Sequence, residues 1–164
     1  MIPSKTPWWK GSRGEWYVIA QVALFGLVFF GPSTWFGWPT WTFPHTRLGS
    51  IGSGTLLLMG ILLVVTGIFK LGRNLTPVPY PKEQSTLVEK GPYQLVRHPM
   101  YSGAILVAFG WAFWVGGWVT IGYAIILFFF FDIKASREEQ WLKEKFSGYF
   151  EYQKRVRKLI PFVY

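Results

Sequence analysis

The sequence has no cysteine, and its 164 residues include only two histidines, His45 and His98. Without thiols the chain can form no disulfide, and it lacks both a thiol nucleophile and the soft sulfur ligands of zinc or iron–sulfur sites. Two histidines this far apart do not make a metal site without several carboxylate partners, so we predict none.

Acidic residues are also scarce, since eight Asp and Glu stand against 17 Lys and Arg, which gives a formal net charge of +9. Such a charge can indicate nucleic-acid binding. Here, however, most basic residues lie at the ends of apolar segments, where anionic lipid headgroups explain them better. Hydrophobic residues make up 51% of the chain and aromatic residues 20%, well above the average soluble protein. We therefore predict a single-domain, all-α integral membrane protein that binds no nucleic acid.

Four apolar segments stand out, at residues 16–30, 48–71, 99–115 and 118–131. Only the second is comfortably long, because its 24 residues reach roughly 36 Å against a hydrocarbon core of roughly 30 Å. The third can begin at Pro99, a residue suited to the first turn of a helix. The fourth can continue past Asp132 as a helix that leaves the membrane. We predict about four transmembrane helices, with Gly116 and Gly117 turning a tight hairpin, followed by cytoplasmic C-terminal helices.

The basic residues test this arrangement independently. Three of them, Lys5, Lys10 and Arg13, precede the first span, while residues 70–97 carry five more and eight follow the fourth span; only Arg47 falls on the opposite side. By the positive-inside rule, both termini and residues 72–100 are cytoplasmic. No small-residue cleavage pattern follows the first span, so we expect it to be uncleaved. Tryptophans fit two interfacial belts, Trp8 and Trp9 on one side and Trp35, Trp38 and Trp41 on the other.

Residues 49–54, Gly-Ser-Ile-Gly-Ser-Gly, look like a nucleotide-binding loop but open an apolar helix instead of following a strand. Close helix packing through small residues is the better interpretation. The strand, Gly-rich turn and helix of soluble methyltransferases have no candidate in this chain.

A first polar cluster occupies residues 91–103, where Arg97 and His98 directly precede the third span. A guanidinium, an imidazole and the free N–H groups of a helix N-terminus together suit an anionic group such as a carboxylate. The alternative is an ordinary juxtamembrane basic pair, with Pro99 starting the helix.

A second cluster begins where the fourth span leaves the membrane. Laid on one helix, Ala135, Glu139, Leu142, Phe146 and Tyr149 form a single stripe, in which Glu139 is the acidic member. An inward carboxylate needs a positive partner, which Arg97 or a bound ammonium supplies. The alternative is a solvated acidic pair, with Glu139 and Lys143 spaced i,i+4. The basic tail at residues 154–158 predicts an interfacial amphipathic helix.

Together the two clusters resemble the isoprenylcysteine carboxyl methyltransferase and phospholipid methyltransferase family. The core motif lies at Asn74-Leu75-Thr76-Pro77, Leu87-Val88, Gly91-Pro92-Tyr93 and Arg97-His98-Pro99-Met100-Tyr101-Ser102-Gly103. The C-terminal motif comprises Glu138, Glu139, Leu142, Phe146, Gly148, Tyr149, Tyr152, Val156, Arg157 and Pro161. The resemblance covers roughly residues 70–162, and two motifs in this order are far more specific than either alone.

The resemblance implies an S-adenosyl-L-methionine-dependent membrane methyltransferase with a cytoplasm-facing cofactor pocket built by residues 72–103 and 132–162. It implies a cofactor site at Tyr93, Val96, Arg97, His98, Pro99, Tyr101, Glu138, Glu139 and Tyr152, and catalytic roles for Arg97, Arg157 and Glu139. We expect His98 to take the cofactor carboxylate and Glu139 its ammonium. Arg97 or Arg157 would hold an anionic group of the acceptor.

The methyl acceptor stays open between a carboxylate on a prenyl-like group, a phospholipid amine and a small thiol. Methyl transfer needs alignment and exclusion of water more than a protein nucleophile, and a lipophilic acceptor can arrive from the bilayer. Two alternatives remain. One is an NADPH-dependent membrane reductase of the sterol reductase type, and the other is a non-catalytic membrane adaptor.

Overall fold

The computed structural model describes residues 13–35, 37–40, 42 and 46–164. In this part the elements follow one another as α1 (Glu15–Phe30), α2 (Arg47–Leu71), η3 (Gly72–Asn74), η4 (Gly91–Gln94), α3 (Pro99–Val115), α4 (Trp118–Lys145) and α5 (Tyr149–Arg155). The only extended pairing among the described residues is an isolated bridge, so the prediction of an all-helical chain is confirmed. The predictions for Lys5, Lys10, Trp8, Trp9, Trp41 and His45 lie outside the described residues.

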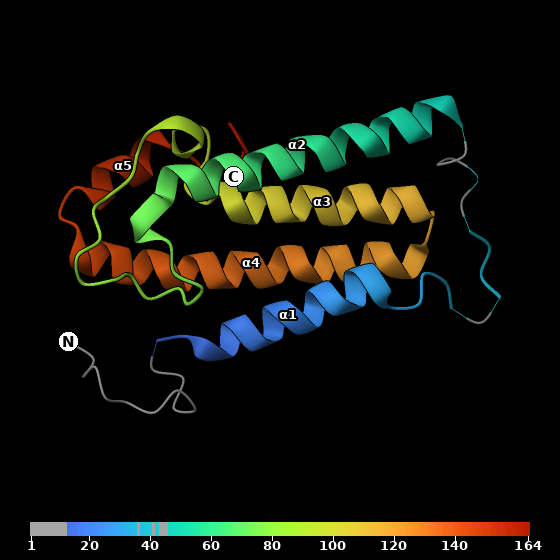
Figure 1. The fold of residues 1–164 in the computed structure, drawn as a ribbon, viewed down its shortest axis with the longest axis horizontal. Coiled ribbons are helices and arrows are strands. Elements are labelled where there is room, and N and C mark those ends of the chain that lie inside the picture. Colours follow the sequence, from blue (N-terminus) through green and yellow to red (C-terminus); the bar gives the residue numbers. More distant parts are fainter. Residues whose placement is uncertain (1–12, 36, 41, 43–45) are drawn as a thin grey trace.

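The four long helices lie side by side, and successive helices run in opposite directions (Figure 1). The connection between α1 and α2 and the turn between α3 and α4 lie at one end of the bundle. The start of α1, the segment between α2 and α3, and α5 lie at the other end. Residues 72–98 and the C-terminal region, far apart in sequence, therefore meet at a single end.

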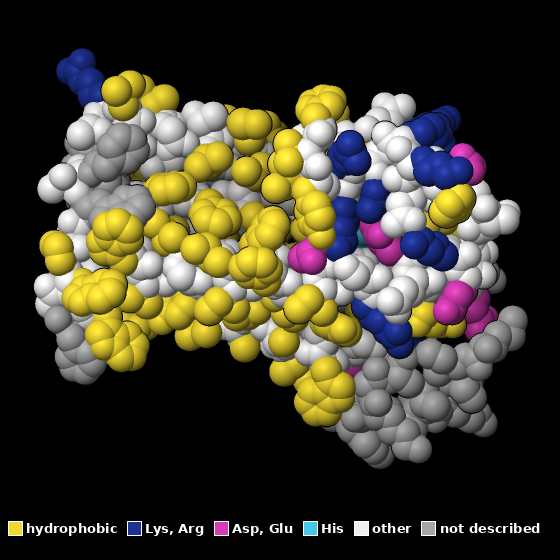
Figure 2. Space-filling model, turned by 180° about the vertical axis from the view of Figure 1, so that it is seen from behind, with side chains coloured by type: hydrophobic (Ala, Val, Ile, Leu, Met, Phe, Trp, Pro, Cys, Tyr) yellow, Lys and Arg dark blue, Asp and Glu magenta, His cyan; other side chains and the backbone are white. Residues whose placement is uncertain are grey.

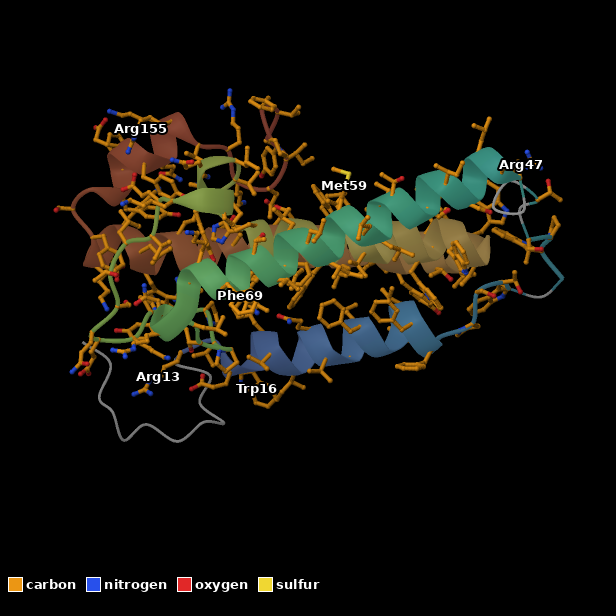
Figure 3. The ribbon with its side chains drawn as sticks, turned by 45° about the horizontal axis from the view of Figure 1, so that its top comes forward. Arg13, Trp16, Arg47, Met59, Phe69 and Arg155 are labelled. Carbon is orange, nitrogen blue, oxygen red and sulfur yellow. The ribbon has the colours of Figure 1, made fainter. Side chains whose placement is uncertain are left out.

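Charge is divided between these two ends. Figure 2 shows hydrophobic side chains covering the helices, with acidic and most basic side chains gathered toward one end. Arg13 and Arg155 lie at that end, whereas Arg47 lies at the other (Figure 3). Exposed apolar side chains such as Leu58, at 60% exposed, and Leu62, at 53%, lie between the ends. This pattern is typical of helices that face lipid.

Two helical stretches in the described part, Arg47–Asn74 and Trp118–Lys145, are long and apolar enough to cross a membrane. The helices Glu15–Phe30 and Pro99–Val115 are apolar but shorter. Two spans are thus clear, and the crossing of the bilayer by α1 and α3 stays a prediction.

Local sequence explains the helix boundaries. The Thr46 hydroxyl caps α2 by accepting from the Gly49 N–H at 3.1 Å, and Pro99 begins α3. At the end of α3, Gly116 adopts the left-handed conformation with φ of +64°, which glycine tolerates without a steric penalty. Trp118 begins α4 two residues later, so the predicted tight hairpin is present.

Glycines bring α2 and α3 into close contact. A Cβ added to Gly60 would lie 2.6 Å from the carbonyl oxygen of Gly103, and one added to Gly103 would lie 2.6 Å from that of Gly60. At Gly52 and Gly54 an added Cβ meets no atom within 4 Å. Gly49 and Ser53 of the predicted stretch are buried, and the close backbone approach at Gly60 lies further along α2.

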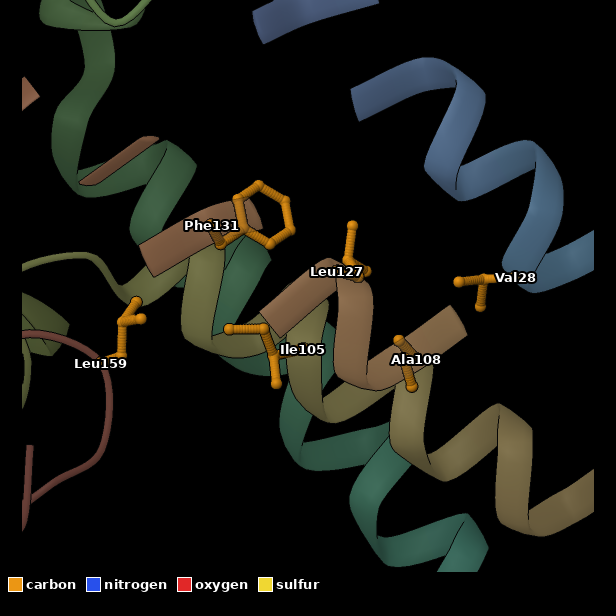
Figure 4. Close-up of a cluster of buried hydrophobic side chains, with 7 residues drawn as sticks. Val28, Ile105, Ala108, Leu127, Phe131 and Leu159 are labelled. Carbon is orange, nitrogen blue, oxygen red and sulfur yellow. The ribbon is translucent and has the colours of Figure 1, made fainter. Parts of the chain in front are cut away.

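A buried apolar cluster joins α1, α3, α4 and the C-terminal segment (Figure 4). Its members are Val28, Ile105, Ala108, Ala124, Leu127, Phe131 and Leu159, each at most 8% exposed. Within a bilayer such contacts stabilise through close packing, because lipid chains are as apolar as these side chains. Leu159 ties the C-terminal segment to the helix bundle.

Two predictions about the C-terminal region are wrong in detail. α4 ends at Lys145 and α5 begins at Tyr149, so Phe146 and Tyr149 do not continue the stripe of Ala135, Glu139 and Leu142 on one helix. The helix predicted for residues 154–158 stops at Arg155, and the backbone is extended at Val156. This extended segment pairs with the segment that leads into α3.

Candidate functional site

The start of α3 is held by a short parallel pairing with the C-terminal segment. Val96, which is fully buried, pairs with Arg157. The Arg97 N–H donates to the Arg157 carbonyl at 2.8 Å, and the His98 N–H donates to the Lys158 carbonyl at 3.2 Å. Two successive backbone hydrogen bonds thus fix the residues that carry the guanidinium and the imidazole.

Arg97 and Glu139 form a buried ion pair behind this junction. The Arg97 Nε atom lies 2.7 Å from Glu139 Oε1, and the two side chains are only 8% and 7% exposed. Arg97 also donates to the backbone carbonyls of Gln153, at 3.2 Å, and Val156. The second Glu139 oxygen accepts from the Gln153 side-chain amide at 2.8 Å. Such complete pairing is what a buried ion pair requires.

Glu139 lies in the part of α4 beyond the apolar segment that ends at Phe131. Burial alone would raise the pKa of its carboxyl, but hydrogen bonds from His98 and Arg97, together with their charge, lower the pKa to about 2. Glu139 is therefore ionised throughout the physiological pH range.

His98 stands between the two adjacent carboxylates of α4. Its Nε2 atom lies 3.1 Å from Glu139 Oε1, and its Nδ1 atom lies 3.8 Å from Glu138 Oε2. The imidazole stacks on the Tyr101 ring with centroids 5.4 Å apart and an interplanar angle of 3°. The Tyr101 hydroxyl donates to Glu138 at 2.8 Å. His98 and Glu139, distant in sequence, thus meet as predicted.

A cavity opens beside this cluster, with about 790 Å³ of empty space when its opening to solvent is included. One wall comes from the η4–α3 region, with Tyr93, Arg97, His98, Pro99, Met100 and Tyr101. Another comes from α4 and the region that follows it, with Glu138, Leu142, Phe146, Tyr149 and Tyr152. The site therefore combines charged, aromatic and apolar walls at the charged end of the bundle.

Residues 75–88, here called the covering segment, supply the third wall. They contribute Thr76, Val78, Pro79, Pro81, Ser85, Thr86, Leu87 and Val88. The Asn74 side chain closes the base of the segment with hydrogen bonds to the backbone of Thr86, at 3.0 Å and 3.2 Å. The Lys145 ammonium holds its tip, with Ser85 Oγ at 2.8 Å and the Glu83 carbonyl at 2.9 Å.

Two buried tyrosines secure the junction of η4 with α5. The Tyr152 hydroxyl donates to the Tyr93 carbonyl at 2.7 Å, and the Tyr93 hydroxyl donates to the Gly67 carbonyl of α2 at 3.4 Å. Burial and the negative charge of Glu138 raise the pKa of Tyr93, and burial raises that of Tyr152. Both phenols therefore stay neutral hydrogen-bond donors.

The predicted site residues divide into two groups. The cavity is lined by Tyr93, Arg97, His98, Pro99, Tyr101, Glu138 and Tyr152. Val96, Glu139 and Arg157 are outside its lining. Glu139 is held behind His98 by Arg97 and Gln153, and the Arg157 side chain is exposed while its backbone carbonyl accepts from Arg97.

The resemblance placed the covering segment in the pocket, within residues 72–103, but it singled out no residue of the segment as a site residue. Its residues show no helical or strand periodicity. The alternation of Pro77, Pro79 and Pro81 was the available signal, because repeated proline favours extended backbone over helix. Such backbone, anchored at both ends, can lie across a cavity.

The chain is similar to known proteins both in sequence and in fold. The sequence pattern of the family described as phospholipid methyltransferase matches residues 49–148. Protein-S-isoprenylcysteine O-methyltransferase B of Arabidopsis thaliana is 34% identical over 113 residues, which cover 66% of this chain and 57% of that protein. Steroid 5-alpha-reductase DET2 of Gossypium hirsutum is 30% identical over 111 residues, which cover 65% of this chain and 42% of that protein.

A solved structure, that of the eukaryotic intramembrane Ras methyltransferase ICMT (isoprenylcysteine carboxyl methyltransferase), has the same fold. The TM-score is 0.66 at 21% sequence identity, and the match covers 99% of this chain and 55% of that one. The chain therefore spans little more than half the length of the methyltransferases it matches. With two apolar helices long enough to cross a bilayer, the chain is a membrane protein. Since the family pattern covers more than half of its residues, it belongs to the phospholipid methyltransferase family.

Proposed function

We propose that this protein is an S-adenosyl-L-methionine-dependent methyltransferase that acts on a lipophilic acceptor at the membrane. The observation that carries the proposal is the cavity at the charged end of the apolar bundle, where His98, Tyr101 and Glu138 lie together. A water-soluble cofactor can reach this end, while an acceptor dissolved in lipid can reach the same place along the helices. Membership of the family supports the same activity.

The lining residues fit the cofactor. Its amino-acid part carries a carboxylate and an ammonium, and the cavity offers hydrogen-bond donors for the first and a carboxylate for the second. We assign the ammonium to Glu138, which lines the cavity. The carboxylate goes to His98 and to the amides of Met100 and Tyr101, which lie in the first turn of α3 and lack intrahelical partners. This assignment replaces Glu139 by its neighbour, because the Glu139 oxygens already accept from Arg97 and Gln153.

Bound there, S-adenosylmethionine supplies a methyl group activated by a positively charged sulfur. The protein's part is to hold and orient the cofactor and the acceptor and to exclude water from them. Glu139 contacts the side chains of both Arg97 and His98, so Glu139 and Arg97 together position His98. The covering segment shields the cavity, and the ring of Tyr80 packs edge-on against Trp141 of α4 with centroids 5.4 Å apart. Arg97 thus acts in positioning, and Arg157, exposed at the surface, stays available to an anionic headgroup or an acceptor carboxylate.

We further propose that α1 and α3 also cross the bilayer and that the charged end faces the cytoplasm. Lipid-facing side chains on all four long helices support this arrangement. The acceptor is then a lipid-anchored carboxylate, as in the isoprenylcysteine methyltransferases that this chain resembles, or a phospholipid amine.

Calorimetry on the detergent-purified full chain tests the proposal. We expect saturable binding of S-adenosylhomocysteine, the demethylated product, because it retains every group assigned a partner above. Absence of heat from protein that still unfolds cooperatively would overturn the proposal. Methyl transfer from radiolabelled cofactor to a prenylated cysteine with a free carboxylate, and not to the corresponding amide, would identify a carboxyl acceptor. Transfer to phosphatidylethanolamine would identify an amine.

A second candidate, an NADPH-dependent reductase, is favoured by the similarity to a steroid 5-alpha-reductase. NADPH in the same titration separates the two enzymes, because a reductase binds it and a methyltransferase does not. A non-catalytic adaptor binds neither ligand, and substitution of His98 then leaves the biological phenotype unchanged.

A further inference from the structure

Four tyrosines line the cavity: Tyr93, Tyr101, Tyr149 and Tyr152. Three of their hydroxyls donate to acceptors within the protein. Tyr93 donates to a carbonyl of α2, Tyr152 donates to the Tyr93 carbonyl, and Tyr101 donates to the Glu138 carboxylate. These three hydroxyls hold the walls of the site together.

The fourth hydroxyl differs. Tyr149 is only 1% exposed, yet its hydroxyl has no hydrogen-bond partner among the described residues. Buried polar atoms are nearly always paired, and an unpaired one costs free energy that folding alone does not recover. Because Tyr149 also lines the cavity, its unpaired hydroxyl indicates a partner that arrives with the ligand.

The surroundings of Tyr149 select the kind of partner. Burial and the nearby charge of Glu139 raise the pKa of this phenol, so it stays protonated and uncharged. Its neighbours along the chain in the cavity wall are Leu142 and Phe146, which are apolar. The carboxylate and imidazole that suit charged groups of a ligand, Glu138 and His98, meet at the start of α3. An uncharged polar atom flanked by flat apolar surface matches this position.

We infer that the Tyr149 hydroxyl hydrogen-bonds to the nucleoside half of the bound cofactor, at a ribose hydroxyl or an adenine nitrogen. This inference rests on the proposed function, because it requires an adenosine-containing ligand in the cavity. Tyr149 is then a specificity-determining residue. In the sequence it stood out only as a member of an apolar stripe.

Calorimetry and thermal unfolding of Tyr149→Phe in detergent test the inference, with S-adenosylhomocysteine and 5′-methylthioadenosine as probes. The second probe keeps the nucleoside and lacks the ammonium and carboxylate. We expect Tyr149→Phe to weaken both probes by the same factor, on the order of three- to tenfold, the range of one neutral hydrogen bond. The ligand-free protein should unfold at the same temperature or a higher one, since an unpaired hydroxyl has been removed.

Tyr152→Phe is the matched control, because it removes a phenol hydroxyl from the same wall that is already bonded internally. It should lower the unfolding temperature of the ligand-free protein, which Tyr149→Phe should not. Unchanged affinity of Tyr149→Phe for both probes, weakening of S-adenosylhomocysteine alone, or a drop in the unfolding temperature would each overturn the inference. If the unmodified protein binds neither probe, the proposed function itself fails.

Discussion

Glu138 and Glu139 are adjacent in α4, yet successive residues of a helix point about 100° apart, and their surroundings differ accordingly. The Glu139 carboxylate is buried and accepts from three side chains, those of Arg97, His98 and Gln153. The Glu138 side chain is 26% exposed and lines the cavity. One carboxylate therefore belongs to the framework of the site, and the other faces the cavity.

Substitution of each carboxylate by its amide should separate these roles. Glu139→Gln leaves the Arg97 cation buried without a counter-charge, which costs about 3–5 kcal/mol and lowers the unfolding temperature by on the order of 10 °C. Glu138→Gln should change the unfolding temperature little and weaken S-adenosylhomocysteine by about tenfold or more, because a charged hydrogen bond is lost. Differential scanning fluorimetry and calorimetry on the same samples measure both. A reversed order of the two effects would refute this division of roles.

The pH dependence of Glu139 provides a second readout of the same pair. Its pKa is about 2 in the folded protein, against 4.5 as the ordinary value. A lowered pKa contributes stability that is complete above pH 4.5 and is lost as the pH falls toward 2, here roughly 3 kcal/mol. The wild-type protein should therefore lose stability over this interval more steeply than Glu139→Gln. Parallel acid unfolding curves would show that the pairing contributes nothing.

At the scale of single residues, the sequence placed His98 and Glu139 in one cofactor site, because both belong to motifs of one family. Their side chains are in contact, but of the two only His98 lines the cavity, and the sequence did not predict which carboxylate of the adjacent pair does so. The Gln153 amide donates a hydrogen bond to Glu139, and Arg97 donates one to the carbonyl of Val156. Gln153 and Val156 both lie in the segment whose path after α4 depends on tertiary packing, so periodicity along a single helix could not reveal these contacts.

Among the helices, the contact between α2 and α3 depends on the absence of side chains. Gly60 and Gly103 face each other so closely that a methyl group on either would lie 2.6 Å from the other's carbonyl oxygen. Because α3 begins at the residues of the site, any separation of α2 from α3 also moves the wall that carries His98. Helix packing and site geometry are thus coupled through this pair.

We expect Gly103→Ala to destabilise the protein by about 1–3 kcal/mol, since backbone is the obstacle and cannot swing away. Gly52→Ala is the matched control, because its added methyl meets open space on α2 and alanine favours helix by up to about 1 kcal/mol. Thermal unfolding in detergent should therefore shift down for the first variant and stay level or rise for the second. Equal shifts would mean that α2 and α3 are not in close contact.

Helix positions could be predicted well from the sequence, and the connections could not. The spans expected at 48–71 and 99–115 match α2 and α3 within one residue, because apolar segments bounded by Pro99 and Gly116 carry strong signals. The end of α4 at Lys145 and the extended segment beyond Arg155 have only weak sequence signals. Their path is set by the hydrogen bonds that Arg97 and His98 make to the Arg157 and Lys158 carbonyls.

Across the whole molecule, the lengths of the helices and the division of charge bear on how the protein sits in a bilayer. α1 has 16 residues and α3 has 17, which corresponds to about 24–26 Å against a hydrocarbon core of roughly 30 Å. A mismatch of a few ångströms is accommodated by local thinning of the bilayer at modest cost. The short helices therefore remain compatible with crossing, provided that the two ends of the bundle lie on opposite sides.

Cysteine labelling tests this directly, since the chain contains no cysteine of its own. Arg47 and Arg155 are both exposed and lie at opposite ends of the bundle (Figure 3). In intact spheroplasts, a membrane-impermeant maleimide should label Arg47→Cys and leave Arg155→Cys unlabelled until the membrane is permeabilised, because the basic end stays in the cytoplasm. Labelling of both variants from outside would mean that the bundle does not cross the bilayer. Labelling of Arg155→Cys alone would mean that it crosses in the opposite orientation, with the cavity on the outer side of the membrane.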